Sequence, residues 1–374
     1  MKKTIFFWSP MLSHVGTISA VYSMAKSLKD YGDFQIYLIN IFGEFQNFND
    51  NEIKKINIFG DLNSLPKTGI ASKISIYIFT ILAIPLLIFW IIKKRPFLII
   101  SNLVGYIPNL LSFFFQFKVI NSIQGYPRFN FIRSFVWKIF YRRSYHLITM
   151  TNLTKSLIEK KFNINKSRIT TMENPIISKK IRSLSNQEID DKEKFIFTND
   201  VYCSIGRLTR QKNFIELLEG FHKFNKDKQK KINLIIIGDG EEKNNLENYI
   251  KKNKIQNCYL LGFKDNPFKY LKRSKLYIST SLWEDPGHTL IEAGYLNVPI
   301  ISSGCPNGPK EIIKDHINGL KYELSDSDDL ANKFKKFNNL TDKDIFKLKK
   351  NFKRDIVHKY TKHRFAKKFM KIIN

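Results

Sequence analysis

A strand-to-helix connection in the last third of the chain constrains the fold more than any other stretch. The apolar and β-branched run 276–280 predicts a buried strand, Pro286-Gly287 predicts a tight turn, and a helical pattern begins near Thr289. Thr289 is a favourable N-cap residue, and the free backbone N–H groups of a helix start commonly bind phosphate. We therefore expect an α/β domain with a phosphate site at the end of this strand.

Two glutamates flank this turn, Glu284 before it and Glu292 after it, with seven residues between them. Thr289 and Glu292 also have the spacing of a capping box, in which two side chains satisfy a helix start without any ligand. The alternative is that Glu292 faces a bound molecule. This stretch alone leaves both interpretations of Glu292 open.

A second strand, loop and helix start upstream carry positive charge. Gly206 follows the expected strand 201–205, and Arg207 and Lys212 lie in the loop before an expected helix at 214–225. Two cations and a helix start suit a diphosphate, because guanidinium and ammonium groups make charge-assisted hydrogen bonds with phosphate oxygens. This second element favours a ligand at Glu292.

Together these motifs resemble those of the GT4 glycosyltransferases, which move a sugar from a nucleotide diphosphate onto an acceptor. Glu284 and Glu292 match the Glu-x7-Glu motif of that family, and Arg207 and Lys212 match its Gly-Arg-x4-Lys-Asn motif. The resemblance is dense in residues 202–322 and thinner before them.

Two further runs carry the resemblance. Residues 237–240 match the family's strand-turn in the middle of the domain, and residues 305–311 are most similar to members that build bacterial surface polysaccharides such as O-antigen, lipopolysaccharide and capsule. The resemblance implies a GT-B fold of the α/β class, with two Rossmann-like doubly wound domains facing a central cleft. It also implies a retaining, hexosyltransferase-type enzyme that moves a sugar from a nucleotide-diphosphate sugar to a lipid-linked saccharide in cell-surface polysaccharide synthesis.

By this resemblance, Glu284 would hold hydroxyl groups of the donor sugar, and Glu292 would hold the ribose. Charge builds on a phosphate oxygen as the sugar leaves, and the two cations and the helix start would stabilise it, so no metal or other cofactor is expected. Retention is compatible with a double displacement or a same-face attack. The predicted catalytic residues are Glu284, Arg207 and Lys212, and the predicted donor-binding residues are Glu292, Gly287, His288, Thr289, Gly206, Phe263 and Gly16.

The first part of the chain predicts another doubly wound domain. A strand at 4–8, a helix at about 17–30 and a strand at 34–41 follow one another. Ligands bind at the carboxyl ends of such strands, so the first loop, which contains His14 and Gly16, is a candidate site. His14 is as compatible with a structural role as with an acceptor-side role.

Gln124 is the other candidate on the acceptor side. It follows an expected strand at 119–123, at the place where members of the resembled family usually carry a His-Gly pair. The pair here is Gln124-Gly125, so a histidine-based role is not expected at this position. A glutamine amide could still hydrogen-bond a sugar hydroxyl.

The pattern predicts four segments. Residues 1–177 form an acceptor-binding domain with membrane-associating helices, and the polar, charge-mixed run 178–194 is a linker. Residues 195–355 form the nucleotide-sugar-binding domain. By resemblance, residues 356–374 form a helix that crosses back to the first domain.

Charge and composition indicate where such a protein would work. The formal net charge is +29, and no Asp or Glu occurs in residues 62–158, which suits an anionic membrane surface. The uncharged run 74–92 ends in three cations, Lys93, Lys94 and Arg95. We expect a helix bent at Pro85 that lies in the membrane interface, while an ordinary core helix and a spanning helix remain alternatives.

The expected partners follow from these observations. They are a nucleotide sugar, a polyprenyl-diphosphate-linked acceptor and an anionic membrane surface, with no nucleic acid. Three widely spaced cysteines argue against a disulfide framework, so we expect a cytoplasmic protein, peripheral on the inner face of the cytoplasmic membrane. Two alternatives are a GT-B nucleotide-sugar epimerase and a basic module that binds membrane or nucleic acid without catalysis.

Overall fold

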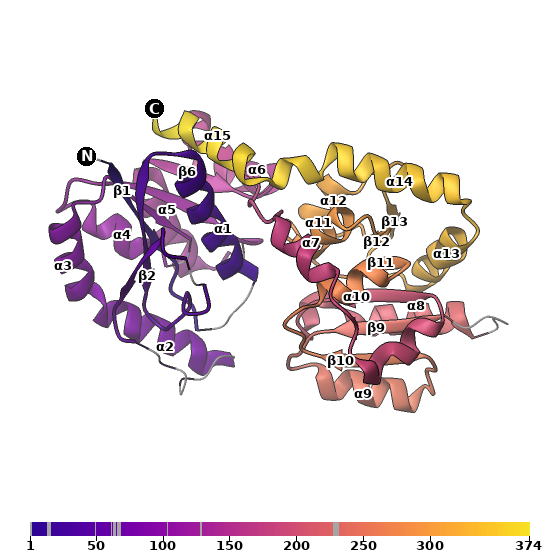
Figure 1. The fold of residues 1–374 in the computed structure, drawn as a ribbon. Helices are drawn as coiled ribbons and strands as arrows, with labels where there is room; N and C mark the ends of the chain where they lie inside the picture. Colours follow the sequence, from indigo (N-terminus) through magenta and orange to yellow (C-terminus); the bar gives the residue numbers. More distant parts are fainter. Residues whose placement is uncertain are drawn as a thin grey trace. The chain divides into compact units, whose positions relative to one another are not determined.

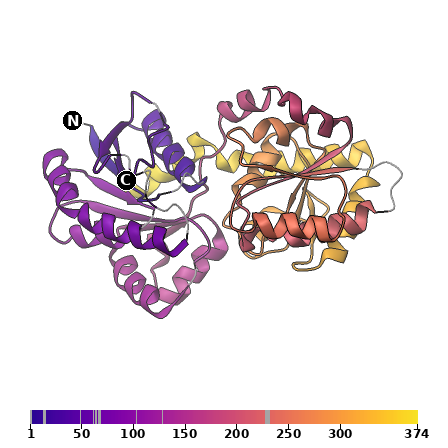
Figure 2. The same cartoon turned by 90° about the horizontal axis from the view of Figure 1, so that it is seen from below.

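The computed structural model of the protein describes residues 2–12, 16–48, 50–60, 62, 65, 69–102, 104–127, 129–226 and 232–374. The chain forms two compact units. Unit 1 comprises Met1–Ile176 together with Tyr360–Asn374, and unit 2 comprises Ile177–Lys359. Each unit is a parallel sheet with helices on both faces (Figure 1; Figure 2).

The sheet of unit 1 has its described strands in the order β3-β2-β1-β4-β5-β6-β7, all of them parallel. The chain moves outward from β1 to β3 and then restarts on the other side of β1. At this switch point the carboxyl ends of β1 and β4 lie side by side, where doubly wound sheets bind ligands. The strands are β1 (Lys3–Trp8), β2 (Phe34–Asn40), β3 (Lys54–Asn57), β4 (Leu98–Ser101), β5 (Lys118–Ile123), β6 (His146–Thr149) and β7 (Ile169–Thr171).

Helices cover both faces of this sheet. On one face, Phe365 and Phe369 of α15 pack in one core with Met24 of α1, so the end of the chain belongs to unit 1. On the other face, Ile91 of α3 and Ile107 of α4 share a second core. The helices of unit 1 are α1 (Gly16–Tyr31), α2 (Gly69–Leu82), α3 (Ile84–Lys94), α4 (Tyr106–Leu111), α5 (Phe131–Arg143), α6 (Asn152–Phe162) and α15 (Lys362–Ile373).

The uncharged run 74–92 forms parts of two helices rather than one. α2 ends at Leu82, α3 begins at Ile84, and the two are bent by 47°. Pro85 lies in the first turn of α3, where its missing N–H leaves no helical hydrogen bond unmade. No single described helix is long and apolar enough to cross a membrane. The bent pair taken together has the length and the apolar composition of a spanning segment.

Unit 2 repeats the plan, with its described strands in the order β10-β9-β8-β11-β12-β13, again all parallel. Tyr202, Phe224 and Phe334 form an aromatic core between this sheet, α8 and α13. The strands are β8 (Val201–Ile205), β9 (Asn233–Ile237), β10 (Cys258–Gly262), β11 (Leu276–Ser279), β12 (Ile300–Ser303) and β13 (Leu320–Tyr322). The helices are α7 (Lys179–Ser185), α8 (Phe214–Asn225), α9 (Lys243–Lys252), α10 (Phe268–Arg273), α11 (His288–Tyr295), α12 (Gly308–Ile312), α13 (Ser327–Asn338) and α14 (Asp342–Asp355).

The run 178–194 has more structure than a linker requires. It contains α7 and the start of a 3-10 helix, Asp191–Thr198, and it belongs to unit 2. Arg273 of α10 donates a hydrogen bond to the Gln187 carbonyl at 2.8 Å, and Lys264 pairs with Glu193 at 2.7 Å. These polar contacts explain why a charge-mixed stretch packs on unit 2.

Candidate active site

The carboxyl ends of β8 and β11, which are neighbours in the sheet of unit 2, bring Lys212 and Glu284 into contact. Lys212 lies between β8 and α8, and Glu284 lies between β11 and α11. The Lys212 Nζ donates to Glu284 Oε1, and the side chains are only 17% and 10% exposed. The structure therefore places two of the three predicted catalytic residues side by side.

Ser281 holds the same carboxylate. Its Oγ donates to Glu284 Oε1 at 2.7 Å, and its own carbonyl accepts a hydrogen bond from Ser303 Oγ at 2.7 Å. Both serines are buried. Oε1 therefore has two donors, whereas no described residue donates to Glu284 Oε2, which can accept a hydrogen bond from a ligand.

Backbone and side-chain hydrogen bonds join the two loops. Thr280 Oγ1 donates to the Lys212 carbonyl at 2.8 Å, and Leu282 N donates to the Gln211 carbonyl at 2.8 Å. The Gln211 amide donates in turn to the Trp283 carbonyl at 2.8 Å. The ammonium and the carboxylate are thus held by the frame around them as well as by their own attraction.

Two glycines allow the β8 and β9 ends to approach closely. Gly206 N donates to the Ile237 carbonyl at 3.0 Å, and Gly238 adopts a φ of +151°. A Cβ at Gly238 would lie 1.8 Å from the Gly206 carbonyl oxygen, so no larger residue fits there. Gly206 itself packs against the Lys212 stem, where an added Cβ would lie 3.0 Å from Cε. The run 237–240 therefore supports the loop that carries Lys212.

The start of α11 corrects one sequence prediction. Thr289 is not the N-cap: α11 begins at His288, Gly287 is the N-cap with a φ of +93°, and no side chain caps the helix. The Thr289 hydroxyl instead accepts a hydrogen bond from the Tyr277 hydroxyl at 2.6 Å. The capping-box interpretation of Glu292 is therefore wrong, because its partner is used elsewhere.

Glu292 and His288 of α11 have shifted protonation. Burial raises the pKa of the Glu292 carboxyl to about 7, and the Lys212 ammonium opposes this rise. Burial lowers the pKa of the His288 imidazole to about 4, with Glu284 acting against this change and Lys212 acting with it. His288 is therefore neutral near pH 7, where Glu292 is partly ionised. The Glu292 carboxyl makes no hydrogen bond to a described residue, although the Glu292 backbone carbonyl accepts one from Leu296 N at 3.0 Å.

Arg207 and Phe263 lie near the same end of the sheet but are exposed to solvent. The Arg207 side chain, predicted to act with Lys212, has no partner among the described residues. Phe263 follows β10, whose last residue, Gly262, accepts a hydrogen bond from Gly238 N at 2.9 Å. The two predicted catalytic cations, Arg207 and Lys212, thus have different surroundings, since only Lys212 is shielded.

The predicted site residues of unit 1 form a less complete site than those of unit 2. His14 lies outside the described residues, and Gly16 is the first residue of α1. Gln124 is engaged within unit 1: its amide nitrogen donates to Ser122 Oγ at 2.7 Å, and its oxygen accepts from the Asn174 amide at 2.8 Å. A ligand would meet Gln124 as part of this polar cluster.

The described residues contain no group of three or more His, Cys, Asp or Glu side chains arranged to hold a metal ion. The Asp-x-Asp pairs at 326–328 and 342–344 begin helices instead. Asp326 accepts hydrogen bonds from the first turn of α13, and Asp344 forms a capping box with Thr341 at α14.

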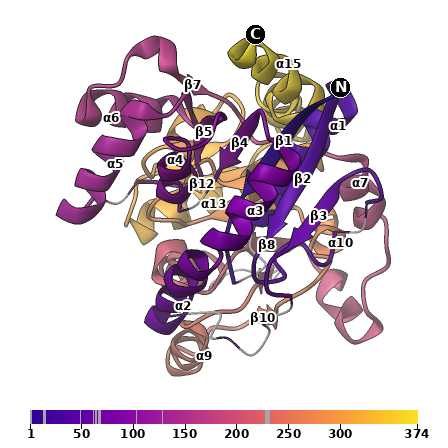
Figure 3. The same ribbon diagram turned by 90° about the vertical axis from the view of Figure 1, so that its left-hand side faces the viewer.

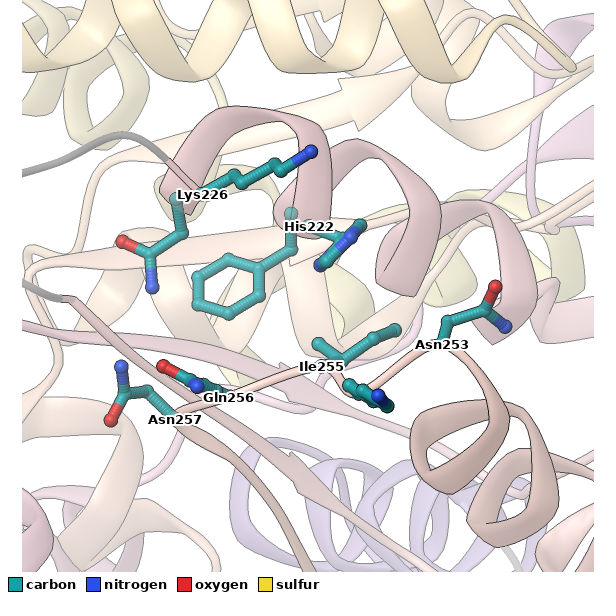
Figure 4. Close-up of a pocket in the computed structure, with 9 residues that line it drawn as sticks. His222, Lys226, Asn253, Ile255, Gln256 and Asn257 are labelled. Atoms are coloured by element: carbon teal, nitrogen blue, oxygen red, sulfur yellow. The ribbon is translucent and has the colours of Figure 1, made fainter.

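A hollow at the amino ends of strands in unit 2 contains none of the predicted site residues. His222 and Lys226, at the end of α8, and Asn253, Gln256 and Asn257, before β10, line it (Figure 4). These residues lie at the amino ends of β9 and β10, away from the carboxyl ends that carry Lys212 and Glu284.

Comparison with solved structures defines the class of the fold. A crystal structure of Anabaena HepE in complex with UDP aligns with a TM-score of 0.78 at 15% identity, covering 100% of this chain and 99% of HepE. The crystal structure of TarM aligns with a TM-score of 0.76 at 16% identity, covering 100% and 99%. The fold is the GT-B fold of two Rossmann-like domains, as the motifs predicted.

Sequence comparison then relates part of unit 2 to a family. Residues 185–355 match the model of the family described as glycosyl transferases group 1. An uncharacterized glycosyltransferase of Methanocaldococcus jannaschii is 38% identical over 202 residues, which are 53% of this chain and 50% of the relative. A UDP-Gal:alpha-D-GlcNAc-diphosphoundecaprenol alpha-1,3-galactosyltransferase of Escherichia coli is 29% identical over 197 residues, 50% of this chain and 49% of the relative. The match spans about half the length of these curated relatives.

Ser281 is the site residue that the sequence analysis missed. A hydroxyl residue three positions before a motif glutamate was the available signal. Only the bend of the β11–α11 loop shows that the Ser281 hydroxyl turns toward Glu284.

Proposed function

We propose that the protein is a retaining glycosyltransferase that moves a sugar from a nucleotide-diphosphate sugar to a lipid-linked saccharide in cell-surface polysaccharide synthesis. The observation that carries this proposal is the shielded pair of Lys212 and Glu284 beside the start of α11, which no side chain caps. In this proposal unit 2 binds the donor and unit 1 binds the acceptor.

The leaving diphosphate would be stabilised by charge. The Lys212 ammonium has three N–H donors, of which Glu284 Oε1 engages one, so the others can reach a phosphate oxygen. The α11 start adds partial positive charge, and Arg207 can supply a second cation from the exposed side. Because these groups are in place before the sugar leaves, they would lower the barrier without a metal.

The two glutamates would orient the rest of the donor. Glu284 offers Oε2 to hydroxyl groups of the sugar, while Lys212 and Ser281 hold Oε1. Glu292 would accept hydrogen bonds from the ribose, a role that its carboxylate form serves best. Support for the ligand role of Glu292 comes from the failure of the capping box at Thr289.

The names of relatives support the chemical classes of donor and acceptor. HepE has been solved with UDP, and the Escherichia coli relative is named for UDP-Gal and a diphosphoundecaprenol-linked acceptor. A Campylobacter jejuni relative, 27% identical over 170 residues, is also named for a diphospho-undecaprenol-linked acceptor. We infer a nucleoside-diphosphate sugar donor and a polyprenyl-diphosphate-linked acceptor for this chain.

A membrane-bound acceptor agrees with the surface of α2 and α3. Phe89 and Ile92 are more than half exposed on α3, and α2 exposes further apolar side chains. Lys93 lies over the rings of Phe89 and Trp90 at the end of α3. We propose that this surface rests in the anionic interface on the cytoplasmic face of the membrane.

The test is turnover of a panel of nucleotide sugars by the purified chain, with and without a polyprenyl-diphosphate-linked saccharide. One donor should be consumed, the nucleoside diphosphate should appear, and the product should keep the donor's anomeric configuration by NMR. Lys212→Ala should abolish most of this turnover. Lys275→Ala, which breaks the Lys275–Asp200 ion pair at the amino ends of β8 and β11, opposite the strand ends that lead into the motif loops, is the matched control. The absence of turnover with every donor would overturn the proposal.

A further inference from the structure

Helix α5 is apolar on two opposite sides. Its inward side packs in a core, where Tyr141 is buried and Trp137 stacks on Tyr141 with ring centroids 5.1 Å apart. Its outward side exposes Phe131 by 88%, Ile132 by 75% and Phe135 by 60%. A surface helix of a soluble domain normally presents polar residues outward, so this second apolar side needs an explanation.

The exposed apolar residues of α5 form one stripe. At about 100° per residue, Phe131, Ile132, Phe135 and Ile139 fall within an arc of about 100° on the helix. Lys138 lies on one margin of this arc and Arg143 lies on the other, whereas Arg142 falls within it, and all three are exposed. An apolar stripe bordered by cations on both margins is the pattern of a helix that lies in a membrane interface.

The turn after α4 extends the stripe. Phe113 and Phe114 are 51% and 76% exposed, and the Arg143 guanidinium lies 4.9 Å from the centre of the Phe113 ring. α4 and α5 are in contact, and α3 shares a core with α4, so α3, α4 and α5 follow one another across one side of unit 1 (Figure 3). We name the α5 ridge as Phe113, Phe114, Phe131, Ile132, Phe135 and Ile139.

The charge near the α5 ridge indicates which kind of partner it binds. No Asp or Glu occurs in residues 62–158, so the charged residues of α4, α5 and the segment between them are all positive. A second copy of the chain placed on the ridge would bring like charges together, which disfavours a symmetric dimer. An anionic bilayer offers headgroups to the arginines and lysines and an apolar layer to the phenylalanines.

We propose that the α5 ridge inserts into the interface of an anionic bilayer, as a second contact beside α2 and α3. This inference rests on the proposed function, which places the acceptor in a membrane, and it deepens that function by assigning a further surface. Two contacts on one unit would fix the orientation of unit 1 on the bilayer, which a single helix pair leaves free to rock.

The experiment measures flotation of the full-length protein with vesicles of phosphatidylcholine alone or mixed with phosphatidylglycerol. The ridge variant is Phe131→Ser with Phe135→Ser. The matched control is Phe195→Ser with Phe346→Ser, which removes phenylalanines that are 56% and 63% exposed on unit 2. The ridge variant should lower partitioning onto anionic vesicles about tenfold or more, because two apolar side chains no longer enter the interface, and the control should match the wild type.

A second variant and a second readout separate the outcomes. Phe89→Ser with Ile92→Ser tests the α3 surface: if only this variant loses binding, the ridge inference is overturned and the α3 surface stands. A fluorophore that reports polarity, placed at Phe135→Cys, should shift to shorter wavelength with anionic vesicles, and a probe at Phe346→Cys should not. Sedimentation that shows a dimer broken by the ridge variant would also overturn the inference.

Failure of the proposed function is distinguishable from failure of this inference. Hydrolysis of a soluble nucleotide sugar should be unchanged in the ridge variant, since Lys212 and Glu284 lie in unit 2. Vesicle binding through the ridge without turnover of any donor would count against the enzyme and leave the ridge in place. Turnover of a donor without ridge-dependent binding to vesicles would support the enzyme and count against the ridge inference.

Discussion

The carboxyl edges of the two sheets differ in how their buried polar groups are satisfied. In unit 2, the loops after β8 and β11 hydrogen-bond one another, so that Lys212, Ser281 and Glu284 have fixed partners. In unit 1, Ser9 follows β1 and Asn102 follows β4, and both are buried. The Ser9 hydroxyl and both polar atoms of the Asn102 amide have no hydrogen-bond partner among the described residues.

This difference separates a site that is built in advance from one that has unused hydrogen-bonding capacity. A buried polar group without a partner costs about 1–3 kcal/mol, so such groups are rare unless a ligand or water satisfies them. We expect unit 2 to bind its donor with little rearrangement of Lys212 and Glu284. We expect unit 1 to complete hydrogen bonds at its switch point when the acceptor binds.

Lys212→Ala tests the preformed side most severely. We expect turnover to fall by about two to three orders of magnitude, because a shielded charge stabiliser is lost and Glu284 loses its ion pair. The turnover of Arg207→Ala should fall by only about tenfold, since the exposed Arg207 guanidinium is screened by water. Rates are measured at saturating donor, with circular dichroism to show that each variant is folded. Equal losses in both variants would contradict the distinction between the two cations.

Glu292→Gln tests whether this carboxyl binds the donor. We expect the donor KM to rise about tenfold with a smaller change in kcat, because an amide accepts fewer hydrogen bonds from the ribose than a carboxylate. The wild-type KM should fall as pH rises through about 7, the folded pKa of Glu292, and the variant should lack this step. Normal donor binding by the variant would assign Glu292 a structural role.

The same variant gives a stability test with a defined sign. Burial raises the pKa of Glu292 from an ordinary 4.5 to about 7, so between these values the folded protein holds a proton that the unfolded chain releases. The free energy of unfolding should therefore fall as pH rises across this window and then level off. Chemical denaturation at several pH values should show a shallower fall for Glu292→Gln than for the wild type.

Asn102→Leu tests the unused capacity of unit 1. The substitution removes two unpaired polar atoms at a buried position, so the variant should be at least as stable as the wild type. Transfer to the acceptor should fall by about tenfold, while hydrolysis of the donor should not change. Thermal denaturation and the two assays are compared in the same preparation. Unchanged transfer would show that Asn102 is satisfied by something other than the acceptor.

Ser281→Ala should have the smallest effect. Glu284 keeps Lys212 but loses one of two donors to Oε1, so we expect kcat to fall by about fivefold with little change in the donor KM. Ser281→Thr, which retains a hydroxyl, should recover most of the loss. A fall in thermal stability that accounts for the lost activity, without recovery by threonine, would indicate a packing role alone.

Local pattern predicted most of the fold. The strands at 201–205 and 119–123 and the helix at 214–225 agree with the structure to within a residue, because buried strands and amphipathic helices have periods that are visible in short windows. The three-residue strand β13 is too short for such a signal. The apolar run continues to Phe117, but α4 ends at Leu111 and hydrogen-bonded turns follow it.

The motifs assigned Lys212 and Glu284 to one predicted site, but they did not predict how the helix beside these residues begins. The choice of N-cap depended on Gly287, whose positive φ starts α11 one residue before Thr289. Once Thr289 lies inside the helix, its hydroxyl accepts from Tyr277, and Glu292 loses its expected partner. A cap is decided by backbone dihedral angles, which residue types only bias.

The sequence by itself determined the alternation of strands and helices, the residue types of the site and the positive charge of residues 62–158. Tertiary structure alone decided which of the two predicted catalytic cations, Arg207 or Lys212, meets the carboxylate. Lys212 and Glu284 are 72 residues apart in sequence, and their contact depends on β8 and β11 being neighbours in the sheet. Arg207, five positions before Lys212 on the same loop, is exposed to solvent. The Lys212–Glu284 contact is set by strand pairing and loop packing, which no local sequence pattern encodes.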